Sequence, residues 1–282
     1  MSETPTRVLI LGGGFAGLSA ARAFERHLRG DRRINVTLVC RNNYLLFTPM
    51  LAEVAAGEID SAHVATPNRA CVHNVHVQQG EVVAIDLEQH RVQLFSPIVR
   101  DQRELLYDHL ILALGSIAAF HHAPGAAEYA FPFKHLGDAQ RIHDRVLDCF
   151  DWAAGASDPV QRRALLTFVV AGGGFAGAEL AAALADFVRD THRFYPRLAG
   201  EPARVLLVHH GARLVQELSE AASAYTYKRL QQQGVDLRTH TAVTGVTPSC
   251  ITLEPGGMVP NAHGALDCRG GPQSGSGGAG PP

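Results

Sequence analysis

The six residues GGGFAG occur twice in the chain, at positions 12 to 17 and again at positions 172 to 177. Each copy has the spacing G-x-G-x-x-G, follows an apolar run and precedes an Ala/Leu-rich segment. Between a strand and a helix, the first glycine permits a tight turn and the second lets a pyrophosphate approach the backbone. The third glycine lets the helix pack closely on the strand. We therefore expect two dinucleotide-binding sites, each with a diphosphate at a helix N-terminus.

The motif residues themselves are the first candidate cofactor contacts. A single motif of this kind also marks ordinary tight turns, but two identical copies with matching flanks favour two binding sites. Two dinucleotides on one chain indicate electron transfer between a bound redox cofactor and a nicotinamide donor. The candidates are Gly12, Gly14, Phe15, Ala16 and Gly17 in the first copy and Gly172, Gly174, Phe175, Ala176 and Gly177 in the second.

The acid that such sites use to hold a ribose hydroxyl is missing from both. It is expected about 20 residues after the glycines, at the end of the next strand. After the first motif, the next strand ends in Cys40, Arg41 and Asn42. After the second motif, the corresponding strand ends at His209. Unlike an acid, an imidazole at this position does not repel a 2′-phosphate, so NADPH remains a possible donor. Alternatively, the imidazole is a neutral substitute that takes over the hydrogen bond of the acid.

The apolar pattern predicts the elements that position these residues. Buried strands are expected at 7–11 and 34–40 around the first motif, and at 165–171 and 203–209 around the second, with an amphipathic helix after each motif. Identical units so far apart in sequence indicate two homologous domains in an α/β fold. Further strands are expected at 81–86, 91–95, 107–116, 234–246 and 250–254, helices at 136–154 and 220–233, and a polar connector at 155–163.

Composition narrows the classes of function. The 282 residues have room for about two domains, and a charge of −2 without a basic stripe argues against nucleic acid as a partner. Five widely spaced cysteines suit a cytoplasmic protein and exclude a redox-active C-x-x-C pair. Fifteen histidines are present, but no ligand set has zinc spacing, so no metal is expected. The N-terminus lacks the basic region of a signal peptide, and no apolar stretch is long enough to span a bilayer.

Several segments, in order, resemble the type II NADH dehydrogenases (NADH:quinone oxidoreductases), which are flavoproteins with two dinucleotide-binding domains. The resemblance covers residues 7 to about 257. It rests on GGGFAGL, RNNYLLFTPMLAEVAAG (41 to 57), YDHLILALGS (107 to 116), FKHLGDA (133 to 139), LLTFVVAGGGFAGAELA (165 to 181) and LQQQGVDL (230 to 237).

The resemblance implies that the first unit binds FAD, that the second binds NAD(P)H and that the electrons pass to a quinone. It places Phe47, Pro49 and Leu51 beside the flavin ring, whereas apart from the resemblance these residues are better interpreted as part of the core. It also places Glu179 near the nicotinamide and flavin. As an alternative, Glu179 in the first turn of a helix would gain about 0.3 to 1 kcal/mol from the helix dipole. Further implied contacts are Val82 at the adenine, Ala113, Gly115 and Ser116 near the FAD pyrophosphate, and Lys134 near the flavin, with a solvated side chain as the alternative for Lys134.

The chain departs from the family after residue 257, where Gly and Pro dominate and apolar periodicity ends. We expect an FAD domain at 1–120 that lacks its returning C-terminal segment, an NAD(P)H domain at 121–257 inserted in it, and a disordered tail at 258–282. A shifted reading frame, a genuine linker or a cloning scar would each explain the tail.

The missing segment also bears on function and location. Because it carries the quinone region and the membrane-contacting helices in the family, an inactive nucleotide-binding fragment is the alternative function. The family further implies a peripheral position on the cytoplasmic face of a membrane and a possible homodimer. A disulfide reductase of similar architecture would need a cysteine pair beside the flavin, which the sequence lacks.

Overall fold

The computed structural model describes residues 5–28, 31, 33–120, 123–261, 266–267 and 270–272. The chain has the α/β fold expected from its sequence, and its contacts divide it into two compact units. The described residues up to Phe47, together with Ala65–Ile117 and Pro272, belong to the first unit. Thr48–Val64 and the described residues from Ala118 to Gly271 belong to the second.

The first unit is built on a parallel sheet with the strand order β5-β2-β1-β9. Helix α1 connects β1 to β2, and β1 pairs with β2 from Thr6 opposite Ile34 to Leu11 opposite Val39. Because β2 and β9 flank β1 on opposite sides, the turn after β1 opens at a switch in strand order, where α/β sheets bind ligands. The bounds are β1 (Thr6–Leu11), α1 (Phe15–His27), β2 (Ile34–Cys40), β5 (His76–Gln79) and β9 (His109–Leu112).

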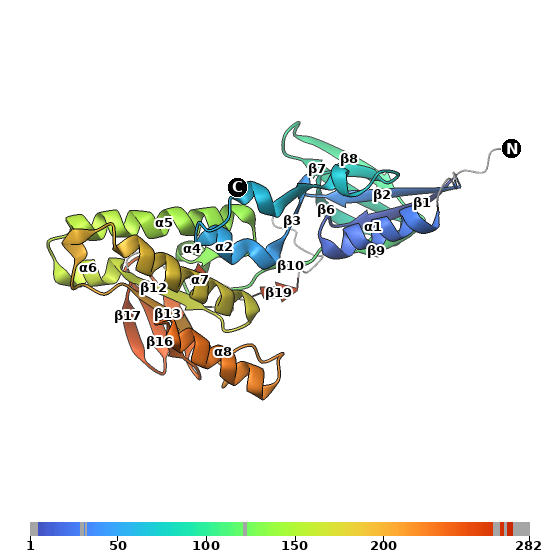
Figure 1. Cartoon of the computed structure of the whole chain (residues 1–282). Coiled ribbons are helices and arrows are strands. Elements are labelled where there is room, and N and C mark those ends of the chain that lie inside the picture. The colour runs from blue at the N-terminus through green and yellow to red at the C-terminus, as the bar shows by residue number, and fades with distance from the viewer. Residues whose placement is uncertain are drawn as a thin grey trace. The chain divides into compact units, whose positions relative to one another are not determined.

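Both faces of this sheet are covered, as the unbroken apolar run of β1 requires. Successive side chains of β1 point to opposite faces. Val8 and Ile10 pack on α1, whereas Leu9 and Leu11 pack on an antiparallel sheet with the order β6-β7-β8 (Figure 1). The three strands of that sheet are β6 (Glu81–Asp86), β7 (Arg91–Ser96) and β8 (Asp101–Leu106).

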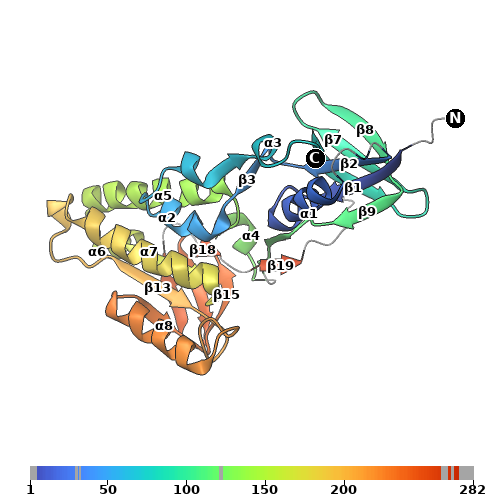
Figure 2. The ribbon, with the colours of Figure 1, turned by 45° about the vertical axis from the view of Figure 1, so that its right-hand side comes forward.

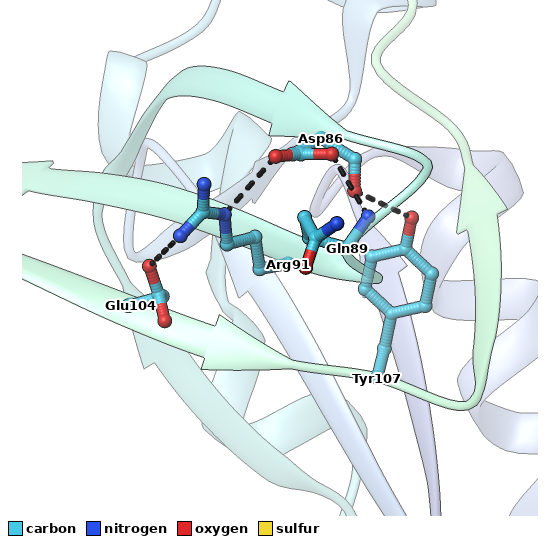
Figure 3. A network of polar contacts seen from close by, with 5 residues as sticks. All are labelled: Asp86, Gln89, Arg91, Glu104 and Tyr107. Atoms are coloured by element: carbon cyan, nitrogen blue, oxygen red, sulfur yellow. Dashed lines mark hydrogen bonds and ion pairs between the residues drawn. The ribbon is translucent and has the colours of Figure 1, made fainter.

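A polar network ties the three antiparallel strands together (Figure 3). Arg91 on β7 bridges the carboxylates of Asp86 on β6, at 3.1 Å, and Glu104 on β8, at 3.4 Å. The Gln89 backbone N–H donates to Asp86, and the Tyr107 hydroxyl donates to the Asp86 carbonyl. The Gln89 N–H and then Arg91 hold the pKa of Asp86 below its usual range. The network thus fixes the layer that covers the back of the first sheet.

The second unit repeats this plan around a parallel sheet with the order β11-β18-β12-β13-β14. Helix α7 (Phe175–His192) connects β12 to β13, as α1 connects β1 to β2. The β12–β13 pair runs from Thr167 opposite Arg204 to Ala171 opposite Val208. The strands are β11 (Phe131–Pro132), β12 (Thr167–Ala171), β13 (Arg204–Val208), β14 (Asp236–Arg238) and β18 (Leu266–Asp267).

The faces of this second sheet also have different covers (Figure 2). Val169 and Ala171 pack on an antiparallel sheet of β15 (Ala242–Val246), β16 (Cys250–Glu254) and β17 (Gly257–Pro260). Phe168 points to the opposite face, where its ring lies 6.3 Å from that of Phe150 on α5 (Leu136–Gly155). Helix α7 packs on the sheet with the fully buried side chains of Leu180 and Leu184.

The segment Thr48–Val64 belongs to the second unit by its contacts, whereas the expected first domain at 1–120 includes it. It contains η1 (Thr48–Met50), α2 (Leu51–Ala55) and η2 (Ser61–Val64). All residues of α2 except Glu53 are buried, and the helix packs on α5 and α7. Because a short apolar helix must bury its side chains against a neighbour, these two helices determine where the segment lies.

The expected disorder from residue 258 is wrong for the described part of that stretch. Strand β17 pairs with β16, with Val259 opposite Ile251. Asn261 is fully buried and donates from Nδ2 to the Thr167 carbonyl at 2.8 Å. Leu266 on β18 is 1% exposed between β11 and β12. Strand edges with free backbone groups can order a segment that has no apolar periodicity of its own. Residues 262–265, 268–269 and 273–282 lie outside the described part.

The expected connector at 155–163 is also partly wrong, since helix α6 begins at Pro159 and ends at Leu165. Asp158 caps it by accepting the Val160 N–H at 2.9 Å, and Pro159 occupies the first helical position. Both features are typical helix starts.

The remaining short elements complete the two units. Among the described residues, no helix combines the length and the apolar character that crossing a membrane requires. The first unit adds β3 (Tyr44–Leu46), β4 (Ala65–Pro67) and α3 (Asn68–Cys71), and the second adds α4 (Ala126–Tyr129), η3 (Pro196–Leu198) and α8 (Glu220–Gln232); β10 (Ser116–Ala118) and β19 (Gly270–Pro272) each include residues of both units.

Two alanine substitutions in the segment 258–282, which was expected to be a disordered tail, test whether its described part is folded. Leu266→Ala should lower the free energy of unfolding by about 2 to 5 kcal/mol, because it leaves a cavity between two strands. Met258→Ala, at a side chain that is 68% exposed, should change it by less than about 0.5 kcal/mol. Urea unfolding of both variants measures the difference. Equal values for the two would show that β18 does not form.

Candidate functional site

Two glycines of the first motif are required by the protein's own backbone. Gly12 has φ +118°, and a Cβ there would overlap the Ala113 carbonyl oxygen. A Cβ on Gly17 would overlap the Gly12 carbonyl oxygen. The Gly12 N–H donates to the Val39 carbonyl at 2.8 Å, which holds the turn against β2. These glycines let α1 begin directly on the end of β1, as the motif predicts.

Gly13 fills the variable position of the motif, and side chains explain why it is glycine. A Cβ there would lie 2.5 Å from Cys40 Cβ and 2.7 Å from Asn68 Nδ2. Asn68 is fully buried, and its Nδ2 donates to the Asn42 carbonyl at 3.0 Å. It therefore holds the loop after β2 against the glycine turn. Nothing in the sequence marked Asn68 as part of the site, because this contact depends on the folded chain.

Gly14 differs from its neighbours because, among the described residues other than those next to it in the chain, no atom lies within 4 Å of the position of its Cβ. Its φ of −85° is ordinary for any residue, and no side chain caps the helix that follows. The first N–H groups of α1 thus have no capping partner and no acid in the first turn. The glycine leaves an open space in front of a helix N-terminus, which is the arrangement that anions bind.

Several other predicted contacts lie next to this turn. Ala113 donates its N–H to the Leu11 carbonyl at 2.8 Å, so the loop that holds Gly115 and Ser116 starts beside Gly12. Gly115 is exposed, with φ +75° and open space around it. The loop with Arg41 and Asn42 is exposed and is held by Asn68, and Val82 is half-buried on β6.

The residues expected beside the flavin ring belong to different units. The Phe15 and Phe47 rings, both exposed, meet edge to face at 5.8 Å in the first unit. Pro49 and Leu51 belong to the second unit. Pro49 is exposed, whereas Leu51 is 3% exposed on α2, which agrees with the core alternative for this side chain.

The second motif reproduces the first turn in detail. Gly172 has φ +112°, and its N–H donates to the Val208 carbonyl at 2.8 Å. In the part of the chain that the structure describes, no atom outside the adjacent residues lies within 4 Å of the Cβ position of Gly174, and no side chain caps α7. Phe175 is 47% exposed, the same value as Phe15. The second unit therefore presents the same open helix N-terminus, with Ala176 and Gly177 following in its first turn.

His209 packs against the second glycine turn and occupies the position where a ribose-binding acid was expected. It is 9% exposed, and its Nδ1 accepts the Gly173 N–H at 3.2 Å. A Cβ on Gly173 would lie 2.7 Å from His209 Cγ and 2.6 Å from Leu214 Cδ2. Burial and then the nearby His210 lower the pKa of His209, against smaller opposing effects of the Arg213 backbone and Glu217. The imidazole is thus neutral at pH 7 and bonded to the turn.

Glu179 is the fifth residue of α7, so its expected place in the first turn is wrong. Partial burial, followed by the charge of Glu53 on α2, raises the pKa of Glu179 above its usual range, although the residue as a whole is exposed. Among the described residues, the buried Glu53 Oε2 has no hydrogen-bond partner. Glu53 was not recognised from the sequence, because only the packing of α2 on α7 brings the two carboxyl groups near each other.

The remaining expectations concern Lys134 and metals. Lys134 is half-buried just before α5, and its backbone N–H donates to Asp138 Oδ2 at 3.0 Å. Within the described ranges, no three His, Cys, Asp or Glu side chains converge as a metal site. Cys40, Cys71, Cys149 and Cys250 are free thiols.

Comparison with known proteins assigns the chain to a family. Residues 6–262 match the model of the pyridine nucleotide-disulphide oxidoreductases. The chain belongs to this family. It is 32% identical over 252 residues to the type II NADH:quinone oxidoreductase Ndh of Mycobacterium tuberculosis, covering 88% of this chain and 53% of that protein. It is 30% identical to the mitochondrial external alternative NAD(P)H-ubiquinone oxidoreductase B4 of Arabidopsis thaliana, covering 92% and 46%.

A solved structure agrees with this assignment at the level of the fold. NDH2 of Plasmodium falciparum in complex with NADH superposes with a TM-score of 0.83 at 20% identity, over 95% of this chain and 56% of that one. The matches to the curated type II NADH:quinone oxidoreductases confirm the resemblance that the sequence predicts. The chain spans about half the length of the curated relatives that it matches.

The two kinds of glycine should respond differently to alanine. Gly17→Ala should lower the free energy of unfolding by about 3 kcal/mol, because its Cβ meets a backbone carbonyl that cannot move without shifting α1. Gly14→Ala should cost less than about 1 kcal/mol, since only the helix N-cap preference changes. Thermal and urea unfolding of the ligand-free variants provide the measurement. A large loss for Gly14→Ala would mean that its glycine has a structural role.

Proposed function

We propose that the chain forms the nucleotide-binding units of an FAD-dependent NAD(P)H oxidoreductase that delivers electrons to a quinone. The first unit binds FAD and the second binds NAD(P)H. The observation that carries the proposal is the pair of open positions at Gly14 and Gly174, each in front of an uncapped helix N-terminus. The protein's own packing does not require glycine at either position, whereas the approach of a diphosphate does.

The residues of the first unit fit a bound FAD. The N–H groups at the start of α1 would hold its diphosphate, and the loops at Arg41–Asn42 and Ala113–Ser116 border the same turn. Bound FAD would supply a two-electron acceptor, which the amino acids of the chain do not provide. Glycine at 14 would let the phosphates approach the backbone, and the edge-to-face pair of Phe15 and Phe47 borders the start of the helix.

The second unit would orient the electron donor in the same way. The start of α7 would hold the diphosphate of NAD(P)H, and Glu179 lies on the same helix, one turn further on. Passing a hydride from NADH to a quinone also takes up one proton from solvent, which completes the quinol. A carboxyl group with a raised pKa keeps its proton to a higher pH than an ordinary carboxyl group does, and we assign the role of holding this proton to Glu179. The quinone is inferred from the names of the relatives from Mycobacterium tuberculosis and Arabidopsis thaliana.

Flavin absorbance tests the assignment of the two units. The full chain, mixed with FAD and desalted, should retain the flavin and lose its absorbance near 450 nm when NADH or NADPH is added under nitrogen. Gly14→Ala should retain much less flavin, because its Cβ occupies the space of the diphosphate. Gly174→Ala should retain flavin normally but require a much higher nicotinamide concentration for bleaching.

The outcomes of this experiment separate the proposal from its alternative. Retained flavin that no nicotinamide reduces, or a chain that retains no flavin, would favour an inactive fragment. Adding a water-soluble quinone to the reduced protein should restore the absorbance. If it does not, the assignment of a quinone as the electron acceptor is contradicted, whereas the assignment of FAD and NAD(P)H to the two units is not. Gly155→Ala, in the last turn of α5 with open space around it, is a matched glycine control outside both turns.

Glu179→Gln should slow the reoxidation of the reduced flavin by quinone by about 10²-fold, the lower range for removing a proton-transfer group. The free energy of unfolding at pH 7 should not fall, because the substitution removes repulsion from Glu53. Stopped-flow reoxidation of the flavin by quinone and urea unfolding measure the two effects. Glu53→Gln retains Glu179 but lowers its pKa toward the usual range, so the corresponding limb of the pH–rate profile should move to lower pH. An unchanged rate in Glu179→Gln would contradict the role.

A further inference from the structure

The ring of His209 is held in a fixed place behind the second glycine turn. Its backbone N–H donates to the Arg238 carbonyl at 2.8 Å, and its carbonyl accepts the Thr241 N–H at 2.9 Å. With the backbone bonded on both sides, the imidazole projects onto Gly173, where a Cβ would lie 2.7 Å from the ring. The residue that occupies the usual place of a ribose-binding acid is thus directed to the phosphate-binding turn.

The hydrogen bonds determine which tautomer His209 adopts. A backbone N–H can only donate, so Nδ1, which faces the Gly173 N–H at 3.2 Å, must be the unprotonated acceptor. Nε2 then carries the proton and can only donate. The side-chain amide of Gln216 lies 3.3 Å from Nε2 and satisfies it when the amide oxygen faces the ring, which a 180° rotation of the amide supplies.

The Gly173 peptide group is held at both ends. Its carbonyl accepts the Val215 N–H at 2.7 Å, and its N–H is bonded to His209. Protonating Nδ1 would place an N–H opposite an N–H, so the ring or the turn would have to move. Gly174 and the start of α7 follow Gly173 directly, and a displaced turn would disturb the helix N–H groups that face a diphosphate.

We propose that His209 is a positioning residue that holds the second glycine turn in its binding conformation only while its imidazole is neutral. This inference rests on the proposed function, because it takes the second turn to be the NAD(P)H diphosphate site. It differs from the ribose contact expected from the sequence, since both ring nitrogens serve the protein's own loop.

The charged groups around His209 come from two elements. From its own loop, His210 lies with its ring centroid 4.8 Å away and opposes protonation, while Glu217 favours it. From the β14 side, Arg238 is ion-paired with Asp236, and the His240 backbone N–H donates to the Gly211 carbonyl. Residues 172–178 of the turn have no ionisable side chain. Burial is the largest influence, and it favours the neutral ring.

The first unit provides an internal comparison. The corresponding place behind Gly13 is taken by Cys40 and Asn68. Burial raises the pKa of the Cys40 thiol, and the amide of Asn68 does not titrate. Neither of these two side chains therefore changes charge between about pH 5 and 8. A pH dependence from this cause is expected in the second unit alone.

Isothermal titration of the full chain with ADP-ribose between about pH 5 and 8 tests the proposal. ADP-ribose contains the adenosine and the diphosphate but no nicotinamide, so its binding does not require flavin or hydride transfer. Affinity should be constant above the pKa of His209 and should fall about tenfold per pH unit below it, since each bound molecule requires the loss of one proton.

Two substitutions of His209 separate the hydrogen bond from the bulk of the ring. In His209→Asn, Oδ1 can accept the Gly173 N–H from the position of Nδ1 without titrating, so affinity at pH 7.5 should stay within about threefold and the pH dependence should disappear. In His209→Leu, the N–H loses its acceptor, and binding should be about tenfold weaker at every pH. The matched neighbour variant His210→Asn should keep the pH dependence but move it to higher pH, because a nearby positive charge is removed.

Specific results would overturn the inference. A full pH dependence in His209→Asn, or wild-type affinity in His209→Leu, would show that the ring does not hold the turn. No binding of ADP-ribose to the wild-type chain at any pH would contradict both this inference and the assignment of the second unit. The expected profiles in a chain that fails to reduce flavin would contradict the proposed function and leave the role of His209 standing.

Discussion

Both units depend on a glycine turn between a strand end and the following helix, and in the first unit no side chain fits at the first and last glycines of that turn. In the first unit, the Gly12 carbonyl oxygen occupies the space where a Cβ of Gly17 would be, and the Ala113 carbonyl does the same for Gly12. This contact brings the axis of α1 directly onto the end of β1. The uncapped N–H groups of the helix then converge on the open space at Gly14, and a diphosphate is the natural occupant of such a space.

The two turns share six residues but have different surroundings. Gly13 is backed by a buried thiol and the amide of Asn68, and Gly173 is backed by the imidazole of His209 and by Leu214. In both units, the side chain at or just after the end of the second strand determines what supports the turn. The motif therefore determines the conformation of the turn. The response of the turn to pH depends on a residue outside the motif, which differs between the two copies.

The sequence predicted the parts of the fold that depend on local pattern. Strands β1, β2, β12 and β13 and helices α1 and α7 were predictable because apolar runs and glycines mark them within a few residues. Helix α6 was missed although Asp158 and Pro159 form a recognisable start. Strand β18 could not be predicted, because its two residues gain order only from the neighbouring edges of β11 and β12.

The same limit applies to the candidate site. Its glycines could be identified from their spacing, but Asn68 and Glu53 reach it through contacts between segments far apart in the sequence. These contacts determine the chemistry, as Glu179 illustrates. Near the N-terminus of α7, the helix dipole favours an ionised carboxylate. Partial burial and then the negative charge of Glu53 have the opposite effect, and they raise the pKa of Glu179 above its usual range. The property that suits this acid to hold a proton therefore comes from the packing of α2, which the glycine motif does not specify.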